Sequence, residues 1–278
     1  MTPLEFARLV QSHDGANPFN EASRMAMADE LRGRVEIVVH DGPRIVAMAY
    51  APGDAPVECA VHPEHRRRGH ATALLDRLVG QGETRFWAHG DLPGARGLAS
   101  ACNLDPSRTL LRMSRPIQPQ EHPGHSEPLD DAIRAFRADD LPGLLAVNAR
   151  AFASHPEQGT MDAPDFERRA ASSWFNPGGI FVAEHDGTIV GFHWTKVEEL
   201  TPGERRGEVY VLAVDPDRAR TGLASRLLHE GLRHLAQAGA RAVELYVDAD
   251  NAAAVSLYEK NGFAEADRDV LYVSTTPA

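Results

Sequence analysis

One strand–turn–helix pattern occurs twice in the chain, and this repetition limits the possible folds more than any other feature. The first copy is VECAVHPEHRRRGHATALLDRLV (57–79), and the second is GEVYVLAVDPDRARTGLASRLL (207–228). In each copy a β-rich apolar run leads into a basic turn and then into an apolar helix pattern. The same number of residues separates the valine that ends the strand from the turn glycine, Gly69 or Gly222. A repeat with preserved spacing predicts two duplicated domains.

The sequence around each copy predicts a mixed α/β domain. In the second copy, apolar runs on both sides of Asp186-Gly187 indicate a hairpin. The repeat unit there leads into a predicted helix (224–239), which is followed by a strand (242–249), a short helix (251–263) and a last strand (269–275). The first copy repeats this order more weakly, beginning with a hairpin at 34–51.

The stretch RPIQPQEHPGHSEPLDDA (115–132), which is rich in Pro, Gly, His and acidic residues, predicts a linker. It divides the chain into two parts of ordinary domain size. We therefore expect an α/β fold with a mixed sheet and two domains, residues 1–126 and 127–278.

Composition and charge exclude several classes of protein. Of the 278 residues 42% are hydrophobic, so the chain can bury real cores and is not intrinsically disordered. Its formal charge of −11 argues against non-specific nucleic-acid binding, which needs a basic surface. The arginines cluster locally, at 66–68 and 205–206, which suits a small anionic ligand.

The two cysteines and the N-terminus carry little further signal. Cys59 and Cys102 do not have the spacing of a metal site or a disulfide framework, so we expect reduced core residues and no metal. The start MTPLEFARLVQSHDG is neither a signal peptide nor a membrane span. We expect a soluble cytoplasmic protein without a membrane partner.

A basic turn that enters a helix through a glycine can bind an anion. Successive backbone N–H groups and the helix N-terminus form a positive concavity, and the glycine lets the ligand approach closely. A pyrophosphate fits such a turn. Taken alone, however, a basic turn that caps a helix is more often a solvated loop.

The pattern in the second copy extends beyond the turn. Its Val-Asp-Pro, Arg-x-Gly-x-Ala and Leu-Leu elements are followed by Asn251-x-x-Ala-x-x-x-Tyr258-Glu-Lys-Asn-Gly-Phe263. Together these residues resemble the GNAT superfamily of acetyl-CoA-dependent N-acetyltransferases, well over residues 130–278 and more loosely over 20–116. The resemblance implies two tandem GNAT domains and acetyl-CoA as the co-substrate.

The same resemblance implies which residues contact acetyl-CoA. In the second copy they are the strand end that holds pantetheine, the pyrophosphate turn and the start of the short helix: Leu212, Ala213, Val214, Ala219, Arg220, Thr221, Gly222, Leu223, Ala224, Ser225, Asn251, Ala252, Ala253, Ala254, Val255 and Ser256. The equivalent residues of the first copy are Cys59, Ala60, Val61, Arg67, Arg68, Gly69, His70, Ala71 and Thr72. The second copy departs from the family pattern at Thr221 and Ala224, but neither residue removes a backbone N–H donor.

Three separated segments resemble one family within that superfamily. RAFASHPEQG (150–159), GFHWTKV (191–197) and GEVYVLAVDP (207–216) are similar to the mycothiol synthase family of tandem GNAT enzymes. This resemblance implies acetylation of the cysteine amine of cysteinyl-glucosaminyl-inositol, the last step of mycothiol biosynthesis. We therefore expect a small-molecule amine acceptor, no nucleic-acid partner and a monomeric enzyme.

Acetyl transfer to an amine needs a base for the amine and an acid for the departing thiolate. An α-amine titrates near pH ~8, so a carboxylate is basic enough, and a tyrosine of pKa ~10 can protonate the thiolate. Glu208 opens the strand whose other end would hold pantetheine, and by resemblance we expect it to be the general base of a direct transfer. Tyr258 lies beside the thioester in the fold that is resembled, and we expect it to be the general acid.

A sugar–inositol acceptor needs polar partners. By resemblance, the residues expected to contact it are Glu208, Glu157, Lys196, Tyr246 and, in the first domain, Glu21. His193 and Trp194 lie in the same segment as Lys196, but a histidine or tryptophan in a strand is more often a core residue.

An ungapped alignment of the two copies predicts that only the second transfers acetyl groups. It places Ala55 opposite Glu208, and an alignment of the tails places Ala99 opposite Tyr258. We expect the first domain to hold, or once to have held, acetyl-CoA without catalysis.

Two alternatives stay open. One is a GNAT acetyltransferase for another amine, such as a protein N-terminus, an antibiotic or a polyamine, the last of which suits the acidic charge. The other is a non-catalytic acyl-CoA-sensing module.

Overall fold

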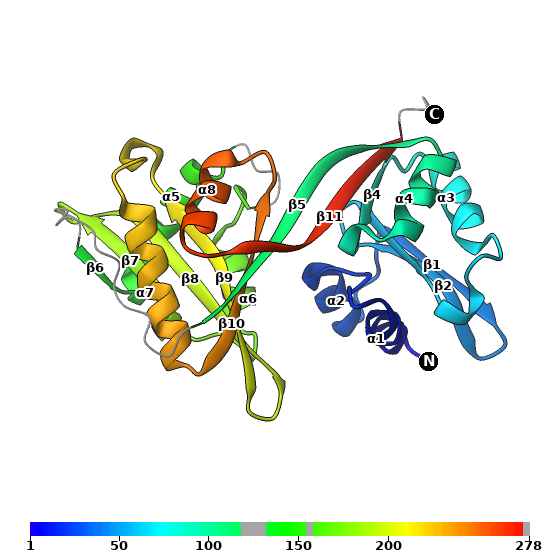
Figure 1. The fold of residues 1–278 in the computed structure, drawn as a ribbon, viewed down its shortest axis with the longest axis horizontal. Helices are drawn as coiled ribbons and strands as arrows, with labels where there is room; N and C mark the ends of the chain where they lie inside the picture. The colour runs from blue at the N-terminus through cyan, green and yellow to red at the C-terminus, as the bar shows by residue number, and fades with distance from the viewer. Residues whose placement is uncertain (118–131, 154–157, 275–278) are drawn as a thin grey trace. The chain divides into compact units, whose positions relative to one another are not determined.

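The computed structural model describes residues 1–117, 132–153 and 158–274. Helices alternate with the strands of a mixed sheet (Figure 1), which confirms the predicted α/β class. The chain forms two compact units. Unit 1 comprises Met1–Arg112, Val247–Ala252 and residues 265–274, and unit 2 comprises Met113–Tyr246, where described, with Ala253–Ala264.

Sequence order therefore does not separate the two units. The segment that begins at Glu265 follows the second repeat in the sequence, but it lies in unit 1. The expected boundary between residues 126 and 127 falls outside the described residues. The domain limits inferred from the linker thus stay a prediction.

Unit 1 contains a mixed sheet that carries helices. Its strands run in the order β1 (Val35–Asp41), β2 (Arg44–Ala51), β3 (Val57–Val61), β4 (Arg85–Ala88) and β11 (Ala264–Ser274). Neighbouring strands are antiparallel except for β3 and β4, which are parallel. The helices are α1 (Pro3–Asp14), α2 (Glu21–Ala28), α3 (His70–Gly80) and α4 (Pro93–Ala101), and β5 (Leu104–Pro116) leaves the unit after Arg112.

Unit 2 repeats this arrangement on a larger scale. Its strands run in the order β10 (Ala240–Asp248), β9 (Glu204–Val214), β8 (Thr188–Thr201), β7 (Ile180–His185) and β6 (Ala132–Ala135). Only β10 and β9 are parallel among these pairs. The helices are α5 (Leu141–Ala151), α6 (Ala163–Ala170), α7 (Leu223–Gln237) and α8 (Ala252–Lys260).

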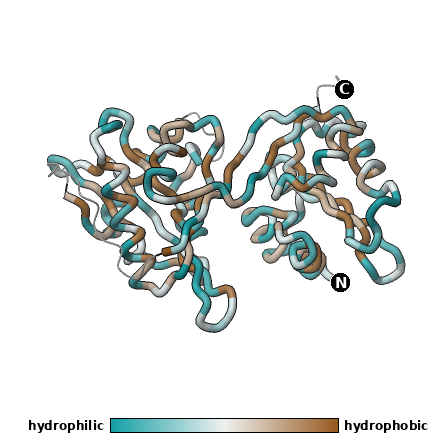
Figure 2. The backbone as a smooth tube through the Cα atoms, in the orientation of Figure 1, coloured by the Kyte–Doolittle hydropathy of each residue, from teal (hydrophilic) through white to brown (hydrophobic). Residues whose placement is uncertain are grey.

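The two hairpins form where the sequence predicts them. Asp186 and Gly187 connect β7 to β8 with φ values of 48° and 74°, the pair of positive angles that an Asp-Gly turn adopts most readily. Gly42 follows β1 with a φ of 58°. Both hairpins bring apolar strands together, and Figure 2 shows apolar stretches, in brown, within each unit.

Helix α7 packs closely on the sheet of unit 2. Its leucines Leu227, Leu228, Leu232 and Leu235 are fully buried, as their helical spacing predicts. Gly231 lies among them, and a Cβ atom there would come within 2.0 Å of the His193 ring. His193 is itself buried, and its Nδ1 lies 2.8 Å from the Leu227 carbonyl oxygen. Burial lowers the pKa of His193 to about 4, so its ring is a neutral core group.

We expect Gly231→Ala to destabilise the protein by about 2 kcal/mol or more, because the added methyl overlaps His193 and forces the helix away from the sheet. The matched control is Gly97→Ala in α4, where nothing lies within 4 Å of the added atom. That control should stabilise by up to about 1 kcal/mol, the ordinary gain of alanine over glycine in a helix. Urea unfolding followed by circular dichroism measures both, and equal effects of the two substitutions would contradict this role of Gly231.

Candidate functional site

The parallel strands β9 and β10 pair only over their first halves. Their register begins with Ala240 opposite Arg205 and ends with Glu244 opposite Glu208, whereas β9 continues to Val214. On its other side β9 stays paired with β8 as far as Val214. Beyond Glu208, backbone groups of β9 that point away from β8 therefore have no register partner in the described part of β10. An extended ligand can pair with such groups.

A β-bulge in β9 accompanies this separation. Trp194 of β8 lies opposite Val211, and the next residue, Thr195, lies opposite Val209. Tyr210 is the extra residue, and such a bulge bends a strand and increases its twist. The residues expected to hold pantetheine, Leu212, Ala213 and Val214, all follow this bulge.

The turn after β9 has the shape that an anion site needs. Arg220 and Gly222 have φ values of 63° and 86°, and α7 begins at the next residue without a side-chain cap. The first N–H groups of α7 are thus left available to a ligand or solvent. Among the other residues expected to contact the cofactor, Asn251 precedes α8, and Ala252, Ala253, Ala254, Val255 and Ser256 form its first turns.

Unit 1 has the same turn. Arg67 and Gly69 have φ values of 60° and 85°, almost those of Arg220 and Gly222, and α3 also lacks a side-chain cap. The pairing of β3 with β4 ends at Glu58 opposite Trp87, although β3 continues to Val61. The two copies therefore share the strand separation as well as the turn.

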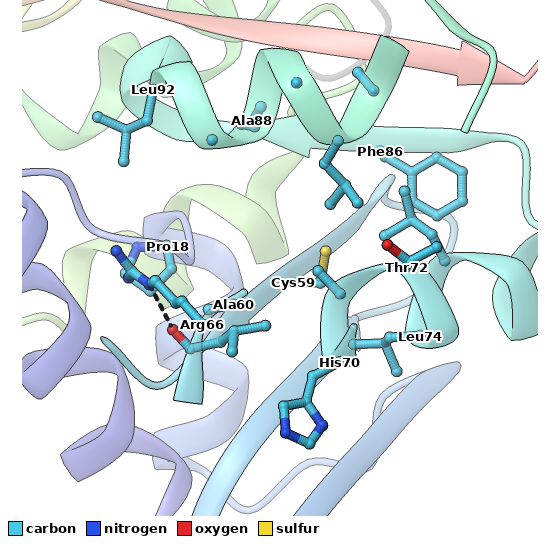
Figure 3. Close-up of a pocket in the computed structure, with 18 of the residues that line it drawn as sticks. Pro18, Cys59, Ala60, Arg66, His70, Thr72, Leu74, Phe86, Ala88 and Leu92 are labelled. Carbon is cyan, nitrogen blue, oxygen red and sulfur yellow. Dashed lines mark hydrogen bonds between the residues drawn. The ribbon is translucent and has the colours of Figure 1, made fainter. Parts of the chain in front are cut away.

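A cavity of about 710 Å³ lies beside β3, α3 and α4 in unit 1 (Figure 3). Its lining includes every residue that the sequence predicts for the first cofactor site except Arg68: Cys59, Ala60, Val61, Arg67, Gly69, His70, Ala71 and Thr72. Arg66 also lines it, donating from Nε to the Val61 carbonyl and pairing with Asp14 at 2.7 Å. The predicted residues are thus brought together around one space.

In unit 2, five ionisable side chains form a charged cluster on strands β8, β9 and β10. Its members are Lys196, Glu198, Arg206, Glu208 and Glu244. Lys196 is the register partner of Glu208 on one side, and Glu244 is its partner on the other. Lys196 Nζ lies 2.9 Å from Glu198 Oε1 and 3.6 Å from Glu208 Oε2. Two residues predicted to act on the acceptor, Lys196 and Glu208, therefore lie side by side.

Lys196 is almost fully buried, and aromatic rings surround its ammonium. Nζ lies 5.0 Å from the Trp174 ring centroid and 5.6 Å from that of Tyr210. Such cation–π contacts offset part of the cost of burying a charge. Arg169 of α6 donates to the Tyr210 hydroxyl at 3.1 Å, which fixes that ring in turn.

The remaining predicted residues occupy different environments. Tyr258 is buried in α8 with its ring 5.7 Å from that of Phe263, and burial raises the pKa of its hydroxyl, so the group stays protonated. Tyr246 on β10 is 46% exposed and accessible to a ligand. Glu21 begins α2 in unit 1, and Glu157 lies outside the described residues. His193 and Trp194 are fully buried, as expected of core residues.

The sequence does not reveal the other members of the charged cluster or the aromatic rings around Lys196. One feature of the sequence could have indicated Glu244. Because successive residues of a strand face opposite sides, Glu244 in VELYVDA lies on the same face as Tyr246. Glu198 and Arg206 look like ordinary charges near the β8–β9 turn, and only the register of the strands brings them to Lys196.

Unit 1 contains a carboxylate–histidine–carboxylate group whose members lie far apart in the sequence, so the sequence does not reveal it; Glu58 is fully buried, and His89 and Asp269 are largely buried. His89 Nε2 lies 2.6 Å from Glu58 Oε1, and His89 Nδ1 lies 2.8 Å from Asp269 Oδ2. Ala55, which the ungapped alignment places opposite Glu208, precedes β3. The residue at which β3 leaves β4 is Glu58, so a carboxylate occupies that topological position in both units.

The protonation of His89 follows from its two partners. Burial alone lowers the pKa of His89, but the hydrogen bonds to Asp269 and Glu58 outweigh it and raise this pKa to about 10. The ring is therefore an imidazolium at neutral pH and has no lone pair left to accept a proton. It connects β3 and β4 to the C-terminal strand β11.

We expect Asp269→Asn to destabilise the protein by about 3 kcal/mol at pH 7, because it leaves a buried imidazolium with one anionic partner. Asp267→Asn is the matched control on the same strand, because its pair with Arg112 is long and partly exposed. In the wild type, the contribution of His89 is complete below its unfolded pKa of ~6.5, declines as pH rises and is lost above about 10. Urea unfolding at several pH values measures this, and a pH dependence unchanged by Asp269→Asn would contradict it.

Among the described residues, no group of His, Cys, Asp and Glu side chains has the arrangement of a metal site. In the same part of the chain, no helix combines the length and the apolar character that crossing a membrane requires.

Comparisons with known families identify relatives of the chain. The model of the acetyltransferase (GNAT) family matches residues 148–263. The mycothiol acetyltransferase of Propionibacterium freudenreichii subsp. shermanii is 41% identical, over 99% of this chain and 88% of that protein. The mycothiol acetyltransferase of Clavibacter michiganensis subsp. michiganensis is 44% identical, over 97% of this chain and 89% of that protein.

Solved structures share the fold across almost the whole chain. A GCN5-related N-acetyltransferase from Sphaerobacter thermophilus matches with a TM-score of 0.71 and 23% identity, covering 96% of this chain and 90% of that one. A tandem GNAT protein from the clavulanic acid biosynthesis pathway also has a TM-score of 0.71, with 18% identity over 99% of this chain and 94% of that one. These matches confirm the predicted GNAT fold.

Proposed function

The chain belongs to the mycothiol acetyltransferase family of GNAT enzymes, and from this we propose that it acetylates the cysteine α-amine of cysteinyl-glucosaminyl-inositol with acetyl-CoA. The observation that carries the proposal is identity above 40% to proteins of that name over nearly the full chain. In the proposed step the amine nitrogen attacks the thioester carbonyl, a C–N bond forms and the C–S bond breaks. The products are the acetamide and coenzyme A.

Acetyl-CoA would lie along the separated part of β9. Leu212, Ala213 and Val214 would pair with pantetheine through their backbone groups, and the turn from Ala219 to Ser225 would hold the pyrophosphate. The start of α8 would close over the same arm. The strand separation and the uncapped N-terminus of α7 support this placement.

Glu208 would act as the general base. It is the last β9 residue in register with β10, so it lies where the proposed pantetheine arm begins. Its carboxylate is 18% exposed, which allows contact with an acceptor or with a bridging water. The amine proton would pass to this carboxylate as the C–N bond forms.

Tyr258 would act as the general acid. A buried tyrosine that stays protonated can donate to the coenzyme A thiolate as the C–S bond breaks. In unit 2 the acceptor would contact Lys196 and Tyr246, together with Glu157, and the contact expected at Glu21 of unit 1 stays a prediction. The pairing of Lys196 with Glu208 supports the first of these contacts.

The cavity of unit 1 would bind a second acetyl-CoA without transferring its acetyl group. Its turn has nearly the same φ values as the turn of unit 2, and its lining contains most of the residues expected to hold the cofactor in the first copy. Glu58, the carboxylate at the matching position, is fully buried, and its Oε1 contacts the His89 imidazolium and accepts from the Asn20 N–H.

We expect Glu208→Gln and Tyr258→Phe each to lower kcat/KM by about a hundredfold, the usual worth of one positioned acid or base. Steady-state release of coenzyme A measures the rate, and equilibrium dialysis checks that acetyl-CoA still binds. Glu230→Gln on α7, whose partner is Arg233 of the same helix, is the control and should leave the rate unchanged. If neither variant slows transfer while the cofactor still binds, the catalytic assignment fails.

Paired substitutions distinguish the two cofactor sites. Ala71 and Ala224 are the second residues of α3 and α7, where a glutamate suits the helix but repels a phosphate. Ala71→Glu should reduce bound acetyl-CoA from two molecules per chain to one and leave activity unchanged, whereas Ala224→Glu should abolish activity. A wild-type stoichiometry of one, or loss of activity in Ala71→Glu, would contradict the division of roles.

An acceptor assay separates the remaining alternatives. Purified protein and acetyl-CoA are incubated with cysteinyl-glucosaminyl-inositol, a polyamine, an aminoglycoside and a peptide amine, and the products are identified by mass. We expect the sugar conjugate to be acetylated with the highest kcat/KM. Preference for another amine would replace the acceptor, and no product with any amine would favour an acyl-CoA sensor.

A further inference from the structure

The charged cluster contains more negative than positive charge. Its three carboxylates, Glu198, Glu208 and Glu244, face two cations, Lys196 and Arg206. One anion is therefore in excess when all five groups are ionised. An acceptor that arrives as an ammonium would add a positive charge beside these five groups, since an α-amine of pKa ~8 is mostly protonated at pH 7.

The two cations are drawn towards the flanking carboxylates. Lys196 Nζ is closer to Glu198 than to Glu208, at 2.9 Å against 3.6 Å. Arg206 contacts Glu198 at 3.3 Å and Glu244 at 3.2 Å. Burial by itself raises the pKa of Glu198, but the hydrogen bonds and charges of Lys196 and Arg206 bring it below its ordinary value. Lys196 and Arg206 thus both pair with Glu198, and this pairing weakens their effect on Glu208.

Glu244 lies on the strand next to Glu208 and directly opposite it. It is the register partner of Glu208 on the parallel strand, so the two side chains leave the same face of strands that lie ~4.8 Å apart. Its side chain is only 7% exposed, less than that of Glu208. A weakly hydrated negative charge beside a carboxylate increases that carboxylate's affinity for a proton.

We propose that Glu244 is a positioning residue for Glu208, which keeps Arg206 away from the general base and makes it basic enough to take the acceptor's proton. This inference rests on the proposed role of Glu208. Glu244 acts on Glu208 and not on the reacting atoms. Without Glu244, Arg206 would lose one of its two carboxylate contacts, and because it lies two residues before Glu208 on the same strand face it could turn to that side chain.

Several charged groups around Glu208 set the direction in which a substitution should move its pKa. Among the described residues they include Lys196 and Glu198 from β8, Arg206 from β9, Glu244 from β10, and Arg169 from α6 through the Tyr210 hydroxyl. Tyr246, two residues after Glu244, lies on the same face of β10. Removing Glu244 takes away a negative neighbour, which should lower the pKa of Glu208. Removing Lys196 takes away a positive neighbour, which should raise it.

The first test measures Glu208 directly and needs no acceptor. Full-length protein labelled with [5-¹³C]glutamate is titrated by NMR, and Glu208→Gln assigns the resonance. We expect the midpoint of Glu208 to fall by about one pH unit in Glu244→Gln and to rise in Lys196→Met. Glu244→Asp, which keeps the charge, should restore most of the shift. An unchanged midpoint in Glu244→Gln would overturn the inference.

The second test measures how Glu244 affects the pH dependence of acetyl transfer. In Glu244→Gln the acid limb of the kcat/KM profile should move to lower pH, and kcat/KM at its plateau should fall roughly tenfold, since a weaker base is a poorer catalyst. Glu230→Gln is the control, and equal thermal midpoints show that each variant is folded. A drop in rate with no shift of the acid limb, or with the shift also present in Glu230→Gln, would overturn the inference.

The two proposals fail in different ways. If the wild type does not acetylate cysteinyl-glucosaminyl-inositol, the acceptor in the proposed function is wrong, and the NMR titration still decides the effect of Glu244 on Glu208. If the wild type acetylates it but both readouts are the same in Glu244→Gln, the proposed function stands and the role of Glu244 falls.

Discussion

The separation of two parallel strands is the constraint on which the candidate site depends. If β10 followed β9 to Val214, the ladder between them would use the backbone groups that an extended cofactor needs. The pairing instead ends at Glu208, and the bulge at Tyr210 bends β9 just beyond it. One break in the ladder therefore creates both a backbone edge for a ligand and a fixed place for a carboxylate at its start.

The same break occurs in unit 1 but is surrounded by different chemistry. Glu58 ends the β3–β4 pairing there, and His89 with Asp269 binds it in a buried ionic bridge. Glu208 instead lies between a lysine and a second carboxylate. Glu58 is thus bound by an imidazolium, whereas we propose that Glu244 keeps Glu208 able to accept a proton. This contrast gives a physical reason why a duplicated scaffold would keep two cofactor sites and one reaction.

The local features of this fold could be predicted from the sequence, and the long-range ones could not. The Asp186-Gly187 hairpin, the turn glycines and the leucine face of α7 depend on neighbouring residues, and the structure confirms them. The contact between His89 and Asp269 joins residues far apart in the sequence, so no spacing reveals it. The ungapped alignment missed Glu58 because β3 is shorter than β9 and the bulge gives β9 an extra residue.

The burial of Lys196 links the stability of unit 2 to its proposed chemistry. An isolated ammonium at this depth would cost several kcal/mol, and two aromatic rings with two carboxylates offset that cost. An apolar side chain would fill the same space with less desolvation, so stability alone does not account for a lysine there. A buried cation can hold an anionic base in one orientation through an ion pair. The proposed proton transfer at Glu208 would give the charged cluster a role that folding does not supply.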